Sequence, residues 1–287
     1  MKALKISAVL TAAVMSAAML CPAFAADANA AQKNTEDKLV YAALGDSIAY
    51  GYGLDDRADS YAALTAKAIN ADEYYDLTQC GADAADVIKI VSDNSDKIAQ
   101  ADVITLSVGA NSLFIPFLRT AAEYAGVDFP DTEVSADKLA DSITPEVVLM
   151  LYLAYSNKKS PETAALNKEF KTFTADWNTL IDDIREINPD AELIVTGYFN
   201  PYRHWNFKRL GINMGDIVHT YIDKMNKFID VSCAKRYLIA DISDVDKDKF
   251  PDIIHFENNK FDPHPDADGH KIIADAVISV LKTRRSL

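Results

Sequence analysis

Residues 39–53 read LVYAALGDSIAYGYG. The first six are apolar and rich in strand-forming side chains, and Gly45-Asp46-Ser47 then ends the run. This pattern predicts a buried strand that delivers Ser47 to its carboxyl end, the edge at which open α/β sheets hold their ligands. A serine on a tight turn beside exposed backbone N–H groups is suited to be a nucleophile with an oxyanion site. Taken alone, however, the three residues fit a strand followed by an ordinary turn equally well.

The first 25 residues have the parts of a secretory signal peptide: a basic start, a short apolar run and Ala23-Phe24-Ala25 as the cleavage signal. We expect cleavage after residue 25 and a flexible leader over residues 26–38. Cys21 raises the alternative of a lipoprotein, but it follows the bulky Leu20 where a small residue is expected. The apolar run is also short for a retained membrane anchor. The sequence therefore predicts a secreted protein.

The remaining chain is acidic, with 27 Lys and Arg against 43 Asp and Glu, a net charge of −16. Nucleic acid is excluded as a partner, since phosphate neutralisation needs clustered basic residues. The length of residues 39–287 and the absence of a Pro-rich or Gly/Ser-rich linker predict one domain, which we expect to be a monomer. Cys80 and Cys233 are not in a Cys-x-x-Cys motif, so two partly buried free thiols are favoured over a disulfide.

Strand and helix patterns alternate along the chain, which predicts a parallel sheet covered by helices on both faces. Strands are expected at residues 39–44, 75–78, 102–108, 192–196 and 237–240. Helices are expected at residues 60–69, 84–99, 170–187, 217–229 after an Asp216 cap, and 271–282.

A segment over about residues 113–160 exceeds what a minimal sandwich of this kind needs. Within it, Thr144-Pro145 predicts a helix start, and Val147 to Tyr155 is apolar on every side. The plainer interpretation is a helix buried against the core. The alternative is a lid or an acyl-binding wall beside a site.

Near the C-terminus, residues 261–270 read FDPHPDADGH. His264 lies between two prolines immediately before a predicted helix, and Asp262 lies two residues upstream. A stiff loop and a nearby carboxylate suit a base that must keep one orientation. The other histidines (His204, His219, His255 and His270) lack this setting and are expected to be surface or structural residues.

Four short motifs occur in this order along the chain: Gly45-Asp46-Ser47 with Gly51, Gly81 after the second predicted strand, Gly109-Ala110-Asn111, and His264-Pro265. Together they resemble the motifs of bacterial SGNH (GDSL-type) serine hydrolases, and the resemblance extends from residue 45 to residue 270. The resemblance implies that Ser47 is the nucleophile and His264 the base. It also implies that the backbone of Ser47, the backbone of Gly81 and the side chain of Asn111 form the oxyanion hole. The implied fold is a flavodoxin-like three-layer α/β/α sandwich with five parallel strands.

Two positions depart from the family pattern. Ser112 stands where an aspartate commonly follows the asparagine, and Phe261 stands where the family's triad acid usually lies. Asp262 is the nearest acid before His264, and we assign it the orienting role. The alternative is a backbone carbonyl, because Pro263 between the two residues can turn the carboxylate away from the ring.

The resemblance implies an esterase or lipase-like acyl hydrolase that needs no cofactor and no metal. Residues 244–248 (DVDKD) resemble the start of a calcium loop, but Lys249 replaces the turn glycine, so a solvated acidic loop is favoured. The expected substrate is a small-molecule, lipid or carbohydrate ester, with no stable membrane anchor. The alternatives are a carbohydrate O-acetyl esterase, which would suit the loop at residues 202–205, and a binding protein without turnover. We expect that loop to be a solvent-exposed crossover.

Overall fold

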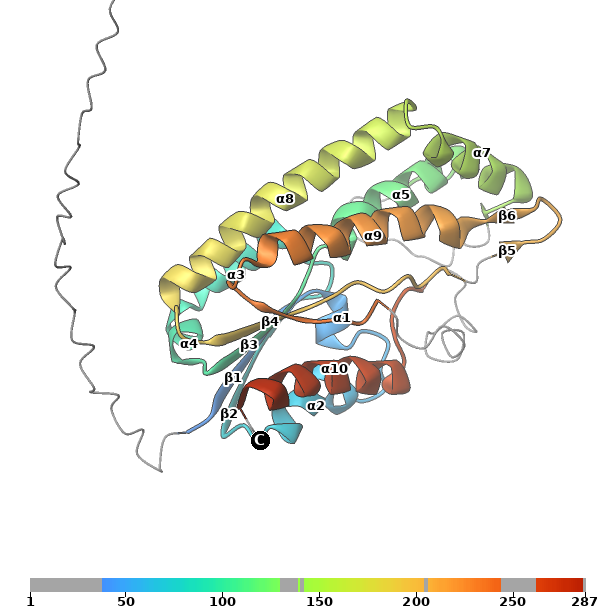
Figure 1. The fold of residues 1–287 in the computed structure, drawn as a ribbon. Coiled ribbons are helices and arrows are strands. Elements are labelled where there is room, and N and C mark those ends of the chain that lie inside the picture. The colour runs from blue at the N-terminus through green and yellow to red at the C-terminus, as the bar shows by residue number, and fades with distance from the viewer. Residues whose placement is uncertain (1–37, 130–138, 140–141, 204–205, 244–261, 286–287) are drawn as a thin grey trace, which may run out of the picture. The chain divides into compact units, whose positions relative to one another are not determined.

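Five parallel strands form the central sheet, in the order β2-β1-β3-β4-β7 (Figure 1). The computed structural model describes residues 38–129, 139, 142–203, 206–243 and 262–285. The strands are β1 (Val40–Gly45), β2 (Glu73–Thr78), β3 (Val103–Ser107), β4 (Glu192–Thr196) and β7 (Leu238–Ala240). The predicted parallel three-layer sandwich is therefore confirmed, and each predicted strand is present to within two residues at either end.

Helices cover both faces of this sheet (Figure 1). One face carries α2 (Tyr61–Ala68) and α10 (Ala267–Arg285). The other carries α3 (Ala84–Asp93), α4 (Ser95–Gln100), α5 (Ala110–Ala125), α8 (Pro161–Ile187) and α9 (Met214–Cys233). The shorter elements are α1 (Ser47–Tyr50), η1 (Arg57–Asp59) and a small hairpin of β5 (Asn206–Phe207) and β6 (Ile212–Asn213).

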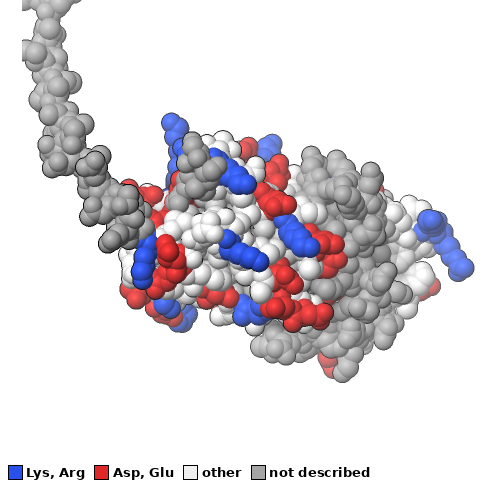
Figure 2. Space-filling view, turned by 90° about the horizontal axis from the view of Figure 1, so that it is seen from below, with Lys and Arg blue, Asp and Glu red and all other residues white. Residues whose placement is uncertain are grey.

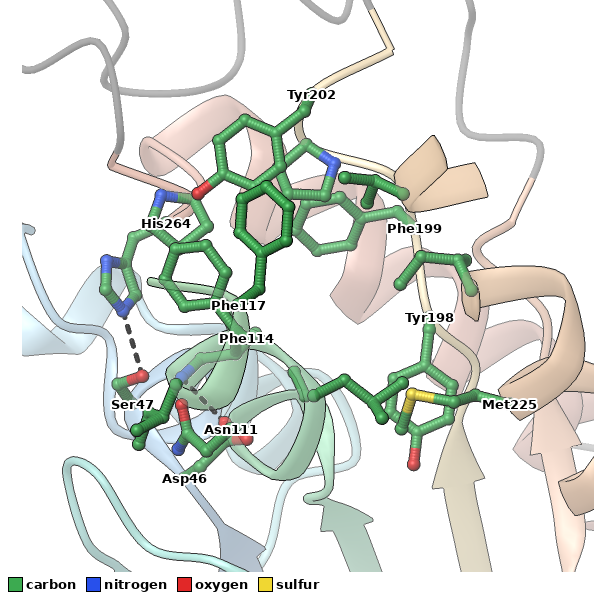
Figure 3. A pocket seen from close by; sticks show the side chains of 18 of the residues that line it. Asp46, Ser47, Asn111, Phe114, Phe117, Tyr198, Phe199, Tyr202, Met225 and His264 are labelled. Carbon is green, nitrogen blue, oxygen red and sulfur yellow. Dashed lines mark hydrogen bonds between the residues drawn. The ribbon is translucent and has the colours of Figure 1, made fainter. Parts of the chain in front are cut away.

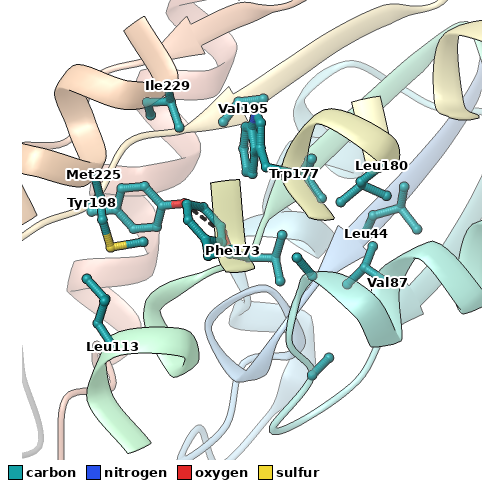
Figure 4. Packing of buried hydrophobic residues seen from close by; sticks show 14 of the residues in the cluster. Leu44, Val87, Leu113, Phe173, Trp177, Leu180, Val195, Tyr198, Met225 and Ile229 are labelled. Atoms are coloured by element: carbon teal, nitrogen blue, oxygen red, sulfur yellow. Dashed lines mark hydrogen bonds between the residues drawn. The ribbon is translucent and has the colours of Figure 1, made fainter. Parts of the chain in front are cut away.

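Strand side chains alternate between two cores, as the two-residue period of a strand requires. In β1, Ala42 and Leu44 join the larger core under α8 and α9, whereas Tyr41 and Ala43 join the smaller core under α2 and α10. Aromatic packing dominates the larger core, where the rings of Phe173 and the fully buried Trp177 lie 5.6 Å apart (Figure 4). Both faces of the sheet are thus sealed, and its carboxyl edge is left for a site.

Several helix starts and bounds differ from the predicted ones. The helices predicted from residues 170 and 271 begin earlier, at Pro161 (α8) and Ala267 (α10). The predicted helix over residues 84–99 is two helices, because Asn94 leaves helical geometry with φ −124° and ψ 30°. The predicted Asp216 cap is wrong: α9 begins earlier, and Asn213 is its N-cap, accepting from the N–H of Gly215 at 2.9 Å. Asp216 instead lies in the first turn and accepts from the Asn213 side-chain amide.

The segment over residues 113–160 contributes most of α5 and the whole of α7 (Pro145–Ser156), which begins at the predicted Thr144 cap. The predicted burial of this helix against the core is confirmed, but only one of its faces is buried. Val148 and Leu151 are fully buried, but Leu149 and Leu153 are 41% and 59% exposed.

Charged side chains of both signs are interspersed on the face seen in Figure 2, without a basic patch there. No helix among the described residues is long and apolar enough to span a membrane. The signal peptide, the leader and the acidic loop at residues 244–248 lie outside the described residues.

Candidate active site

Ser47 stands at the carboxyl end of β1 because of a close approach between β1 and β3. Gly45, with φ +152°, ends β1 against β3, and a Cβ there would lie 2.3 Å from the carbonyl oxygen of Ser107. The next residue, Asp46, donates its N–H to that same oxygen at 2.9 Å. Any larger residue at position 45 would push the strands apart, so the glycine of the motif sets where Ser47 begins α1.

His264 and Asp262 reach Ser47 from the loop that precedes α10. The His264 Nε2 atom lies 2.9 Å from the Ser47 Oγ atom, across a sequence separation of 217 residues (Figure 3). On the other side of the ring, Nδ1 lies 2.5 Å from Asp262 Oδ1, which also accepts from the His264 backbone N–H at 3.0 Å. Pro263 does not turn the carboxylate away, because this backbone bond closes a tight turn that points it at the ring.

Gly81 and Asn111 lie beside Ser47 on the same cavity. Gly81 follows β2, and among the described residues no partner takes its N–H or that of Ser47. Asn111 is held in the first turn of α5, where its Nδ2 donates to the carbonyl of Ala82 at 3.0 Å. A side-chain amide nitrogen carries two hydrogens, so one remains for an oxyanion.

The start of α5 is itself placed by packing. Gly109 precedes the helix with φ +121°, and a Cβ there would lie 2.4 Å from the ring of Phe173 and 2.8 Å from the hydroxyl of Tyr198. That hydroxyl donates to the carbonyl of Val108 at 2.7 Å. The larger core therefore determines where Asn111 lies.

A buried carboxylate adjoins the serine, and the sequence did not reveal its environment. Asp46 is 2% exposed and caps α1 by accepting from the N–H of Ile48 at 3.0 Å. Burial raises the pKa of Asp46 to about 7, against the opposing effects of the Ile48 hydrogen bond and the nearby His264. This carboxyl group therefore titrates near neutral pH within one residue of Ser47.

Tyr52, near the end of the opening stretch, was also missed as a site residue. Its ring lies 4.7 Å from the His264 ring while remaining 51% exposed. The only sequence signal for it was its place among the glycines after Ser47. It forms an exposed aromatic wall on the solvent side of the histidine.

A cavity of about 650 Å³ opens from Ser47 and His264 and runs between α5 and α9. Tyr202 forms part of its wall, is 2% exposed and packs on Phe114 with ring centroids 5.6 Å apart. The expectation that residues 202–205 form a solvent-exposed crossover is thus wrong at Tyr202; residues 204 and 205 lie outside the described chain. Among the described residues, none of α7 lines the cavity, so α7 is not the acyl-binding wall considered from the sequence.

The other candidate residues take structural or surface positions. His270 is fully buried in α10, where its Nδ1 accepts from the N–H of Tyr61 at the start of α2. His219 is exposed and pairs with Asp223 one turn along α9. Cys80 and Cys233 are free thiols, but Cys80 is exposed rather than partly buried. His204 and His255 lie outside the described residues.

No group of three or more potential ligand side chains that could hold a metal occurs among the described residues. The site itself contains a hydroxyl, an imidazole and a carboxylate in line, with amide donors beside the hydroxyl. That set defines a class of protein, the serine hydrolases that act by nucleophilic acyl transfer.

The comparisons with known proteins agree with this class. The model of the GDSL-like lipase/acylhydrolase family matches residues 43–272, and the chain belongs to that family. It is an ester hydrolase with the SGNH fold. No curated protein matches the chain.

Solved structures show the same fold at low sequence identity. The lipase Lip_vut3 from a goat rumen metagenome is 14% identical, with a TM-score of 0.58 over 85% of this chain and 97% of that one. Phospholipase A1 from Streptomyces albidoflavus NA297 is 18% identical, with a TM-score of 0.55 over 85% of this chain and 99% of that one. An extracellular lipase from Streptomyces rimosus is 17% identical, with a TM-score of 0.54 over 84% of this chain and 99% of that one.

Proposed function

We propose that the protein is a secreted serine esterase in which Ser47 is the nucleophile, His264 the general base and Asp262 the orienting acid. The observation that carries the proposal is the continuous line of contacts from Asp262 Oδ1 through both ring nitrogens of His264 to Ser47 Oγ. The contact between His264 and Ser47 joins residues 217 positions apart, and it lies at the mouth of a cavity.

The chemistry follows from these groups. Ser47 Oγ bonds to the ester carbonyl carbon while His264 Nε2 takes the hydroxyl proton, and Asp262 stabilises the imidazolium that forms. The negative oxygen accepts from the Ser47 and Gly81 N–H groups and from Asn111. Collapse breaks the ester C–O bond, and His264 returns its proton to the alcohol. Water then repeats the sequence, releasing the carboxylic acid and restoring the serine hydroxyl.

The secreted location rests on the sequence, through the signal peptide that ends at Ala25. Extracellular relatives are consistent with it, since the Streptomyces rimosus lipase is described as extracellular.

Hydrolysis of p-nitrophenyl esters by the purified mature protein tests the proposal. Ser47→Ala and His264→Ala should each lower kcat by at least about 10⁴, because the residues of a triad act as a unit. Ser279→Ala and His219→Ala are matched controls with the same chemical changes at exposed positions, and they should leave kcat unchanged. Activity that survives Ser47→Ala, or a phosphonate ester probe that labels a different residue, would refute the assignment.

A carbohydrate acetyl ester remains the second candidate substrate. The buried position of Tyr202 weakens it, because this part of the loop packs on Phe114 and is not free to receive a sugar. Acetylated xylan in the same assay separates the two candidates.

A further inference from the structure

Two helices supply much of the lining of the cavity beyond the candidate triad, together with the segment that follows β4. On α5, Leu113, Phe114 and Phe117 face it, and on α9 the residues Ile217, Tyr221 and Met225 do so. The α9 positions recur at intervals of four, so they form one face of that helix over more than two turns. An apolar space that runs along a helix face suits a chain-like ligand.

The polar groups of this cavity gather at one end. In Figure 3, Ser47 and His264 lie on one side and Tyr198 and Met225 on the other, with Phe114 between them. The Tyr198 hydroxyl is already bonded to the carbonyl of Val108, so this residue offers mainly its ring to the cavity. A ligand that reached from the serine to Met225 would therefore meet carbon surface for most of its length.

Size decides how long such a ligand can be. About 650 Å³ would hold roughly twenty water-sized groups, and it falls in the range of sites that enclose small-molecule ligands. A straight acyl chain of about 8–12 carbons fits with room for the ester group. An acetyl group would leave nearly all of the apolar wall uncovered.

We infer that the cavity between α5 and α9 is the acyl site, and that it selects straight-chain esters of about 8–12 carbons over acetyl esters. This inference rests on the proposed function, since Ser47 must hold the ester carbonyl at the polar end. The alcohol part then leaves on the exposed side, past Tyr52 and His264. The acyl chain stays in the cavity while it is bonded to Ser47.

Each methylene that enters the cavity should raise kcat/KM by about fourfold, since burial of one CH₂ contributes about as much free energy as that factor represents. The increase should end when the chain fills the cavity. Wild-type protein assayed with p-nitrophenyl acetate, butyrate, octanoate, decanoate and palmitate should therefore show a maximum at octanoate or decanoate.

Two valines on α9 provide a matched pair for the test. Val218 lines the cavity and is half-buried, whereas Val231 on the same helix is 71% exposed. Val218→Phe should lower kcat/KM for decanoate at least tenfold relative to acetate, because the added ring occupies cavity volume. Val231→Phe should leave the whole profile unchanged. Ile222→Ala, at a second half-buried lining position, enlarges the cavity and should move the maximum to longer chains.

The outcomes separate this inference from the proposed function. Hydrolysis that depends on Ser47 but is flat or falling from acetate to octanoate would overturn the acyl site alone. So would equal loss on every ester in a folded Val218→Phe variant, or an unshifted maximum in Ile222→Ala. If no ester is hydrolysed, titration calorimetry of wild type with sodium decanoate still decides: binding that Val218→Phe weakens supports the site, and no binding overturns it.

Discussion

The carboxyl group of Asp46 should make the stability of the protein depend on pH, and Asp46→Asn should remove that dependence. Asparagine keeps the acceptor oxygen that receives the Ile48 N–H but cannot ionise. The native pKa of Asp46 is raised by burial to about 7, from a reference value of 3.8. Between these two values the native state holds a proton that the unfolded state has lost.

The sign follows from this difference in bound protons. A carboxyl group whose native pKa is raised stabilises the fold fully below its unfolded pKa. This stabilisation is lost as pH rises to the native pKa of about 7, and above that pH the free energy of unfolding does not change further through this group. Each pH unit within the window changes the free energy of unfolding by about 1.4 kcal/mol. Over pH 5–8, Asp46→Asn should therefore gain roughly 2.5 kcal/mol of stability relative to wild type.

Urea unfolding of both proteins at pH 5, 6, 7 and 8 measures this change. Asp56→Asn is the matched control, because Asp56 also caps a helix through its residue i+2, accepting from the Ala58 N–H at 2.8 Å, but is exposed. Its stability difference from wild type should be nearly independent of pH. A constant difference for Asp46→Asn, or an equal slope for Asp56→Asn, would refute the reasoning from burial.

Three further results are expected. Asp262→Asn should lower kcat by as much as about 10⁴ at neutral pH, because the amide no longer selects the histidine tautomer; retention of more than a tenth of wild-type kcat would exclude Asp262 from the triad. Asn111→Ala should lower kcat by roughly 10²–10³ but the free energy of unfolding by only about 1 kcal/mol, through the lost bond to the Ala82 carbonyl; a large fall in Tm would make the residue structural instead. N-terminal sequencing of the secreted protein should begin at Ala26, and a lipid-modified start at Cys21 would contradict the signal-peptide prediction.

Much of the fold could be predicted from the sequence because the deciding interactions are local. The apolar run before Gly45 needs no distant partner to be a strand, and the caps Ser60 and Thr144 each accept from an N–H three residues ahead. The errors fell where a helix end depends on competing polar residues. At the start of α9, Asn213 and Asp216 both carry oxygens suited to a cap, and sequence spacing does not choose between them.

For the site, motif order was enough to select Ser47 and His264, but the direction of each side chain was not readable. Whether Asp262 faces the ring depends on a turn closed by one backbone hydrogen bond. The pairing of Tyr52 with His264 likewise depends on where two loops far apart in the chain meet.

By itself the sequence determined the five strands of the sheet in chain order, the strand end that presents Ser47 and the family to which the chain belongs. These follow from periodicity and from motifs whose residues are neighbours in the chain. Only the tertiary structure decided the burial of Asp46 and of Tyr202, and the cavity between α5 and α9. Burial and cavity volume depend on the distance between elements about a hundred residues apart, and that distance is set by how all the side chains of the larger core pack together.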